Sequence, residues 1–258
     1  MTNISASAVF SLRSRTGVSI LLCKKALEEA QGNEEKAIEI LRKSGEAQAV
    51  KRAGKDQREG NVFLAQSADR AALVLLQCET DFVARNEDFQ AFGQKFADLL
   101  LAEGENAVRT RAEKDLPVIV QKLGENISLG EVLILEAPVL GTYVHTNRKI
   151  GVIVGLDKGE TSVAKDVAMH AAAMNPLYRT PQDVPPEAIE REKEIWKSQL
   201  VKEGKPEAIW DKIMLGKEKK FREENALTTQ EFVKDPTKTV AQYLNGASVQ
   251  AYVRLAVG

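Results

Sequence analysis

The chain has 258 residues, of which 43% are hydrophobic and 28% are charged, so it is long enough for one large domain or two to three small ones with a buried core. Its 36 Lys and Arg residues nearly balance its 37 Asp and Glu residues, giving a net charge of −1. Such a chain has no global electrostatic attraction for nucleic acid, which disfavours a dedicated nucleic-acid binder.

Residues 5–45 have the apolar spacing of three short helices. Ser5, Ser19 and Asn33 precede these helices, and serine and asparagine are preferred N-caps. Gly45 is expected to end the third helix. The inward stripe of the second helix is expected at Ile20, Cys23, Leu27 and Ala30.

The segment from residue 45 to residue 60 is polar and carries no deep apolar stripe. We interpret it as a solvated linker that is helical in part. The alternative is a nucleic-acid patch formed by its basic residues, but no aromatic side chain is interleaved with these charges.

From residue 61 the apolar period becomes strand-like. The first series of expected elements is two strands at 61–66 and 71–79, a helix capped by Asn86, a weaker helix at 113–123 and a strand at 131–137. The second series is two strands at 139–145 and 149–156, a helix at 161–174 and a final strand within 248–257. The sequence therefore predicts an α+β protein with antiparallel sheets, built from two tandem β-β-α-β-like halves.

An insertion interrupts the second half. Pro185 and Pro186 begin a charged helix, and the break at 204–206 precedes another helix. Narrow apolar stripes on two helices joined by a short turn predict an antiparallel hairpin. Two interpretations of Trp196 and Trp210 stay open: each stripe covers the other, or the two indoles dock a partner.

Motifs for nucleotide and cofactor chemistry are missing. No Gly-Lys pair has the spacing of a phosphate-binding loop, and no dinucleotide-binding, G-x-S-x-G or H-E-x-x-H pattern occurs. Cys23 and Cys78 are too few and too far apart for a disulfide framework or a zinc site, which indicates the reducing cytoplasm. We expect no cofactor, no metal and no catalytic residue, because His145 and His170 have no recognisable nucleophile partner.

The chain is expected to be cytoplasmic and to lie free of membranes. No apolar run reaches the roughly 18 residues that span a bilayer, and the first residues lack the basic and apolar regions of a signal peptide.

Several motifs together resemble one family. They are 12–17 (LRSRTG), 23–30 (CKKALEEA), 78–86 (CETDFVARN), 170–178 (HAAAMNPLY) and 232–236 (FVKDP). In this order they resemble the elongation factor Ts family, the guanine-nucleotide exchange factors of elongation factor Tu. Each motif alone is weak, whereas the set extends over nearly the whole chain and is highly specific.

The resemblance implies four parts. These are a module similar to a ubiquitin-associated (UBA) domain at 1–54, a first core subdomain at 55–139, a related second subdomain at 140–180 and 225–258, and a coiled-coil hairpin at 181–224. The implied function is binding to GDP-loaded elongation factor Tu and promotion of GDP release, without covalent chemistry. The implied partner is that protein, with no direct contact to nucleic acid or membrane.

The resemblance also implies the contact residues. Phe82 would enter between two helices of the partner's G domain near its Mg²⁺ site, with Asp81 orienting it. The expected contacts are Thr80, Asp81, Phe82, Val83, Leu123, Gly124 and His145 in the core, and Leu12, Ile20 and Leu21 in the first module. From the residues alone, Asp81 would instead be a turn cap, Phe82 a core residue and His145 an exposed residue at a strand end.

The role of three surplus apolar residues near a helix start is open. Val18, Leu21 and Leu22 either fill the core of the first module loosely or form part of its binding surface. His170 is expected to be a packed histidine. The competing function is a non-catalytic scaffold that binds proteins through the first module and the hairpin, and a homodimer or two-to-two complex through the core or the hairpin is also open.

Overall fold

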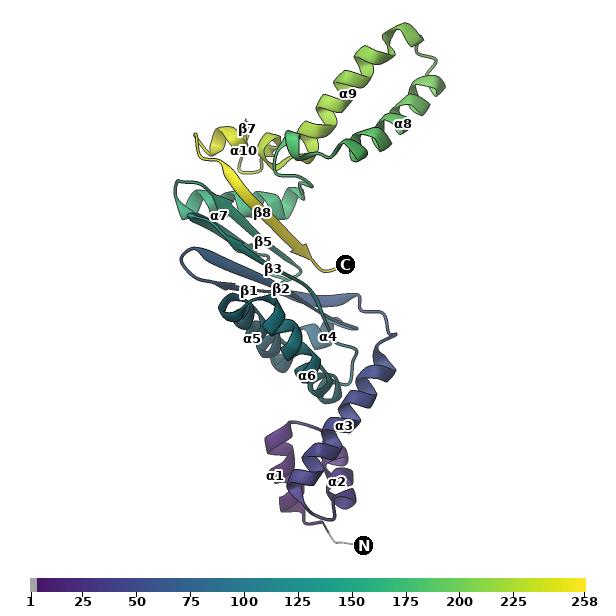
Figure 1. Cartoon of the computed structure of the whole chain (residues 1–258), viewed down its shortest axis with the longest axis vertical. Helices are drawn as coiled ribbons and strands as arrows, with labels where there is room; N and C mark the ends of the chain where they lie inside the picture. The colour runs from purple at the N-terminus through teal and green to yellow at the C-terminus, as the bar shows by residue number, and fades with distance from the viewer. Residues whose placement is uncertain (1–3) are drawn as a thin grey trace.

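The computed structural model describes residues 4–258 and has the expected mixed α+β architecture. The molecule is long: three helices lie at the N-terminal end, two sheets with their helices lie in the middle, and a helical hairpin lies at the other end (Figure 1). Among residues 4–258, no helix has both the length and the apolar character needed to cross a bilayer.

The N-terminal helices are α1 (Ala6–Thr16), α2 (Ile20–Glu29) and α3 (Glu34–Arg52). The three expected caps are confirmed, because the side chains of Ser5, Ser19 and Asn33 each accept a hydrogen bond from a backbone N–H in the first turn of their helix. These caps satisfy donors that have no partner within the helix.

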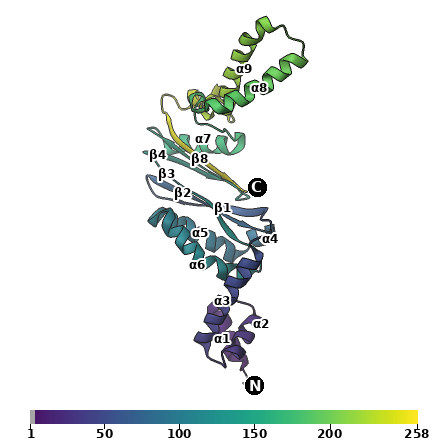
Figure 2. The same ribbon diagram turned by 45° about the vertical axis from the view of Figure 1, so that its right-hand side comes forward.

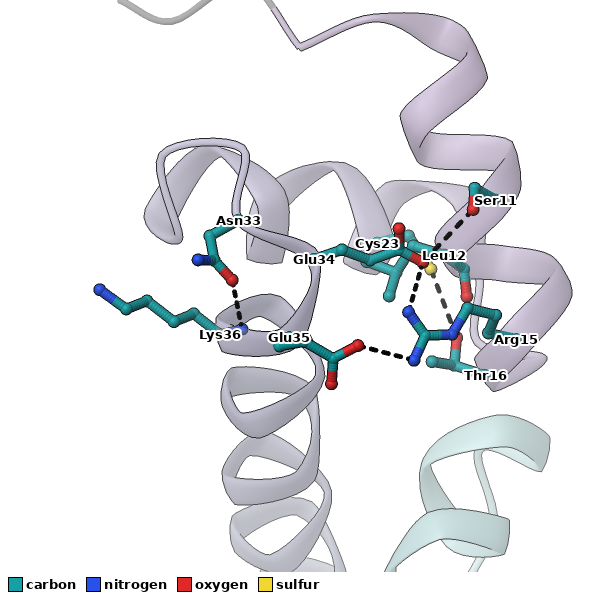
Figure 3. Close-up of polar contacts among 9 residues, drawn as sticks. All are labelled: Ser11, Leu12, Arg15, Thr16, Cys23, Asn33, Glu34, Glu35 and Lys36. Atoms are coloured by element: carbon teal, nitrogen blue, oxygen red, sulfur yellow. Dashed lines mark hydrogen bonds and ion pairs between the residues drawn. The ribbon is translucent and has the colours of Figure 1, made fainter.

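Arg15 joins the end of α1 to the start of α3 (Figure 3). Its guanidinium lies 2.9 Å from a carboxylate oxygen of Glu34 and 2.8 Å from one of Glu35. Both carboxylates also lie at the positive end of the α3 dipole. The ion pairs thus link the two helices at the surface, while the shared apolar cluster of the N-terminal helices holds them together.

The predicted end of the third helix at Gly45 is wrong, because α3 continues to Arg52. Gly45 is buried, and a Cβ on it would lie 3.0 Å from the carbonyl oxygen of Pro117. The missing side chain thus lets α3 cross α6 at close range, so this glycine serves helix packing and not helix termination.

The first sheet has the order β1-β2-β3 and is antiparallel throughout. Its strands are β1 (Glu59–Gln66), β2 (Arg70–Cys78) and β3 (Ser128–Glu136). The short α4 (Asp81–Ala84), α5 (Glu87–Glu103) and α6 (Glu105–Leu123) lie between β2 and β3 in the chain. Phe63 from β1 packs against Phe89 and Phe96 of α5 in the core of this half.

The second sheet has the order β4-β5-β8 and is also antiparallel. Its strands are β4 (Val139–Val144), β5 (Ile150–Leu156) and β8 (Val249–Ala256), and α7 (Thr161–Met174) covers β4 and β5. At Gly141 the strand runs so close to α7 that a Cβ would overlap the backbone of Ala164.

The two sheets pack face to face, so the centre has four layers in the order helices, sheet, sheet, helix (Figures 1 and 2). Val62, Leu73 and Leu135 from the first sheet belong to the same buried cluster as Ile153 and Leu255 from the second. Because both faces of each sheet are buried, the middle strands β2 and β5 read as continuous apolar runs in the sequence.

The hairpin consists of α8 (Pro186–Lys202) and α9 (Trp210–Asn225), with short 3₁₀ turns at Pro181–Asp183, Glu207–Ile209 and Leu227–Thr229. Trp196 is buried against Phe221, with ring centroids 6.0 Å apart. The half-buried Trp210 donates its indole N–H to the carbonyl of Lys205 at 2.9 Å. The burial of Trp196 contradicts docking of a partner by that indole, whereas the ring of Trp210 stays partly accessible and both interpretations remain open for it.

A small unit that the apolar spacing did not predict returns the chain to β8. It contains β6 (Glu231–Phe232), β7 (Asp235–Thr239) and α10 (Val240–Tyr243). Phe232 stacks on Tyr243 with ring centroids 4.0 Å apart. Phe232 belongs to the same buried cluster as residues of α7 and β5, and Tyr243 packs against this cluster.

Candidate functional site

Phe82 is the most exposed large apolar side chain near the centre of the molecule, with 83% of its surface open to solvent. It lies on α4, between the end of the buried strand β2 and the start of α5. The interpretation of Phe82 as a core residue is therefore wrong. An exposed aromatic ring on a fixed base is available to enter an apolar pocket of another protein.

The residues around Phe82 divide between support and surface. Thr80 caps α4 by accepting a hydrogen bond from the N–H of Val83, so Asp81 is not the cap. Val83 packs against the first core. The carboxylate of Asp81 lies 2.9 Å from the guanidinium of Arg85, and both side chains stay accessible. Such an exposed pair contributes little to stability and is free to exchange partners.

Leu123 and Gly124 form the corner where α6 ends. Gly124 has a left-handed backbone, φ 79°, and its N–H bonds to the carbonyl of Val120 at 2.8 Å. Leu123 packs partly on the first core. The next residue, Glu125, accepts hydrogen bonds from the backbone at Glu79 and Thr80, so this corner lies beside the base of α4.

His145 is exposed at the turn between β4 and β5, and its Nδ1 lies 2.8 Å from the hydroxyl of Tyr143. The turn that follows, residues 146–149, borders an open groove of about 680 Å³ that is also lined by Asp81 and Arg85. The packing of the two sheets thus brings the turn after His145 and the loop that carries Phe82 to one region of the surface.

The N-terminal module has two of its three expected contact residues on the surface. Ile20 is 47% exposed and Leu21 is 62% exposed, so the predicted inward position of Ile20 is wrong. Val18 fills the core in its place: it precedes the capping residue Ser19, is buried, and belongs to the apolar cluster beneath the N-terminal helices. Leu12 is fully buried, which contradicts its expected contact with a partner.

The elements that carry the exposed candidate residues lie on one side of the molecule. In both views, α2, α4 and the C-terminal end of β8 are on the right (Figures 1 and 2). The β4–β5 turn lies beside that end of β8, since Ile150 pairs with Ala256. A single partner of sufficient size can therefore reach all of them.

The remaining reactive side chains have structural roles. His170 is buried, its Nδ1 accepts a hydrogen bond from the N–H of Val233, and its Nε2 lies 3.0 Å from an amide oxygen of Gln230. Burial lowers the pKa of His170, which keeps the ring neutral. Burial raises the pKa of the Cys78 thiol to about 12. Across residues 4–258, no group of three or more His, Cys, Asp or Glu side chains could hold a metal ion.

Comparisons with known proteins give one consistent result. The family described as Elongation factor TS matches residues 79–258. Elongation factor Ts of Marinobacter nauticus is 43% identical over all of this chain and 92% of its own length. The proteins of the same name from Aeromonas hydrophila and Photorhabdus laumondii are 42% and 43% identical over all of this chain, and 92% and 93% of their own lengths are covered.

Proposed function

The chain belongs to the elongation factor Ts family, and from this premise we propose that it releases GDP from elongation factor Tu by driving Phe82 into the partner as a wedge. The protein is a nucleotide exchange factor of translation elongation. It catalyses exchange by binding alone and forms no covalent bond with its substrate.

Exchange requires a difference in affinity. The factor by which this protein weakens the binding of nucleotide to elongation factor Tu equals the factor by which the nucleotide weakens the binding of this protein to elongation factor Tu. A nucleotide held with a nanomolar dissociation constant is bound by about 12 kcal/mol, so the coupling must reach several kcal/mol. A group that fits the empty partner and collides with the occupied one supplies such a difference.

The observation that carries the wedge proposal is the exposure of Phe82 at 83% on a base tied to the first sheet. Full burial of a phenyl ring is worth roughly 1.5–3 kcal/mol, which is a substantial part of the required coupling. Asp81 lies next to it with an accessible carboxylate that can take a polar group of the partner.

We propose that the other accessible candidates, which are exposed or half-buried, grip the G domain around the wedge. These are Leu123 and Gly124 beside α4, His145 at the β4–β5 turn, and Ile20 and Leu21 on α2. Leu12 is left out of this surface and supports the packing of α1. An apolar grip suits a chain whose net charge of −1 gives it no long-range steering.

The proposed parts of the chain are the UBA-like module at 1–54, of which 1–3 lie outside the described residues, core subdomains at 55–139 and at 140–180 with 225–258, and the coiled-coil hairpin at 181–224. Separate apolar clusters under the N-terminal helices and under each sheet support this division.

We place the protein in the cytoplasm, where translation occurs. A homodimer or two-to-two complex through the core or the hairpin is tested by light scattering of the protein with and without its partner.

Catalytic turnover is the direct test of the function. Elongation factor Tu loaded with a fluorescent GDP analogue should lose all of its label when this protein is added at about one part in twenty. A scaffold without exchange activity would release no label, or only an amount equal to its own concentration.

Replacing Leu21 with serine tests the N-terminal grip. The substitution removes an exposed apolar contact, and we expect the dissociation constant for nucleotide-free elongation factor Tu to rise about fivefold to tenfold. The matched control is Leu21→Met, which keeps apolar volume and should change the constant by less than about twofold. Equal affinities for both variants, measured by titration calorimetry, would exclude Leu21 from the interface.

A further inference from the structure

The loop before Phe82 is tied to the end of α6 by one side chain. Glu125 accepts hydrogen bonds through Oε2 from the N–H groups of Glu79 at 3.1 Å and Thr80 at 3.0 Å. Its Oε1 accepts the hydroxyl hydrogen of Thr80 at 2.6 Å. Both oxygens of a partly buried carboxylate are therefore committed to two consecutive residues at the base of α4.

A second carboxylate completes the connection in the opposite direction. Glu79 accepts a hydrogen bond from the N–H of Asn126 at 2.6 Å, and its Oε1 lies 3.0 Å from the guanidinium of Arg52 at the end of α3. The hydrogen bond from Asn126, with Arg52 nearby, lowers the pKa of Glu79 and keeps this carboxylate charged at neutral pH. Each of the two glutamates thus binds the backbone next to the other, and we call this arrangement the 79/125 clamp.

The clamp also holds the chain that leaves the N-terminal module. The side-chain amide of Asn126 donates to the carbonyl of Lys55 at 2.9 Å. Together with Arg52, this contact fixes the segment just after α3 against the same loop. The base of α4, the end of α6 and the end of α3 therefore meet at the 79/125 clamp.

The helix that carries Phe82 cannot fix its own position. It has four residues, and one turn of helix is not stable without support from outside. The capping hydrogen bond of this helix is long, with 3.4 Å between the Val83 nitrogen and the Thr80 hydroxyl oxygen. The ring of Phe82 is exposed and gains little packing from the rest of the chain. The far end of α4 is held by Val83 on the first core and by a hydrogen bond from the side-chain amide of Asn61 to the carbonyl of Ala84. The near end, which leads into Phe82, is held by the contacts at Glu79 and Thr80.

We propose that Glu125 is a positioning residue for nucleotide exchange: it holds the Glu79–Thr80 backbone so that Phe82 and the Leu123–Gly124 corner meet the partner as one rigid surface. This inference rests on the proposed wedge function. A free loop would have to be ordered during insertion, and the cost of that ordering would be subtracted from the energy that displaces the nucleotide.

The experiment compares Glu125→Ala with Glu125→Gln, each with Phe82 present and with Phe82→Ala. Glutamine keeps one oxygen for the two backbone N–H groups, and its amide can donate to the hydroxyl of Thr80, so it should retain most of the activity. Alanine removes all three bonds and should lower the exchange rate constant about tenfold or more. The dissociation constant for nucleotide-free elongation factor Tu is measured in parallel, because it stays measurable where exchange is too slow.

The decisive result is the change in the effect of Glu125→Ala when Phe82 is absent. If Glu125 acts through the ring, the loss in rate and affinity should shrink to less than about twofold in the Phe82→Ala protein, whereas the change in melting temperature should be the same with either residue at position 82. Equal losses in both proteins would overturn the positioning role. If Phe82→Ala alone leaves exchange unchanged, the wedge itself is wrong, and this outcome is distinct from a failure of the clamp.

Discussion

Replacing Phe82 with alanine should slow GDP release by about 100-fold while the melting temperature stays within about 1 °C of the original. A central aromatic anchor of an interface typically contributes about 2 kcal/mol or more, and about 2.7 kcal/mol corresponds to a factor of 100. The ring is 83% exposed, so its removal leaves no cavity in the fold. Stopped-flow release of a fluorescent GDP analogue and thermal melting followed by circular dichroism measure the two effects.

Phe89 provides the matched control, because it is the same residue type seven positions later and is fully buried between α5 and the first sheet. Phe89→Ala should cost about 3–5 kcal/mol of folding free energy. The two variants should therefore separate completely, one losing activity and the other losing stability. A large fall in the melting temperature of Phe82→Ala would contradict both its surface position and the wedge.

Replacing Gly141 with alanine should destabilise the packing of α7 on the second sheet by about 3 kcal/mol, since forced overpacking typically costs roughly 1–3 kcal/mol and here the obstacle is backbone. The added methyl group would overlap the main chain of Ala164 in α7, which cannot rotate away as a side chain could. The expected fall in melting temperature is roughly 6–12 °C.

Gly216→Ala is the control for this prediction. Gly216 lies within α9, and a Cβ on it would have no atom within 4 Å. Because alanine favours the helical state over glycine, this change should stabilise the protein by up to about 1 kcal/mol. A Gly141→Ala protein that melts at the original temperature would show that α7 and β4 do not approach this closely.

Local signals in the sequence predicted the elements well. The caps at Ser5, Ser19 and Asn33, the turn between β1 and β2, and the helix at 161–174 are all as predicted. Each depends on hydrogen bonds or side-chain spacing within a few residues. The resemblance carried by residues 78–86 identified the family and singled out Phe82, against the plain interpretation of that residue as core.

Predictions that required knowledge of the packing were the ones that failed. Gly45 has the appearance of a helix stop, but it is the point where α3 touches α6. Ile20 fits a helical stripe that predicts a buried position for it, yet Ile20 is exposed and Val18 is buried in the core instead. Leu12 belongs to a motif of contact residues, and its side chain is buried beneath α2 and α3. Sequence spacing defines the faces of a helix but does not say which neighbour covers each face.

The sequence by itself determined the order of helices and strands, the absence of nucleotide-binding motifs and the family, because these depend on the identities and spacing of residues along the chain. Only the tertiary structure decided that Glu125 holds the loop before Phe82, since Glu125 is 45 positions from Thr80 and 46 from Glu79, and no local pattern connects them. Hydrogen bonds over such separations form when β2 and α6 pack on the same core. The exposure of Phe82 was decided in the same way, by which apolar surfaces the folded chain leaves uncovered.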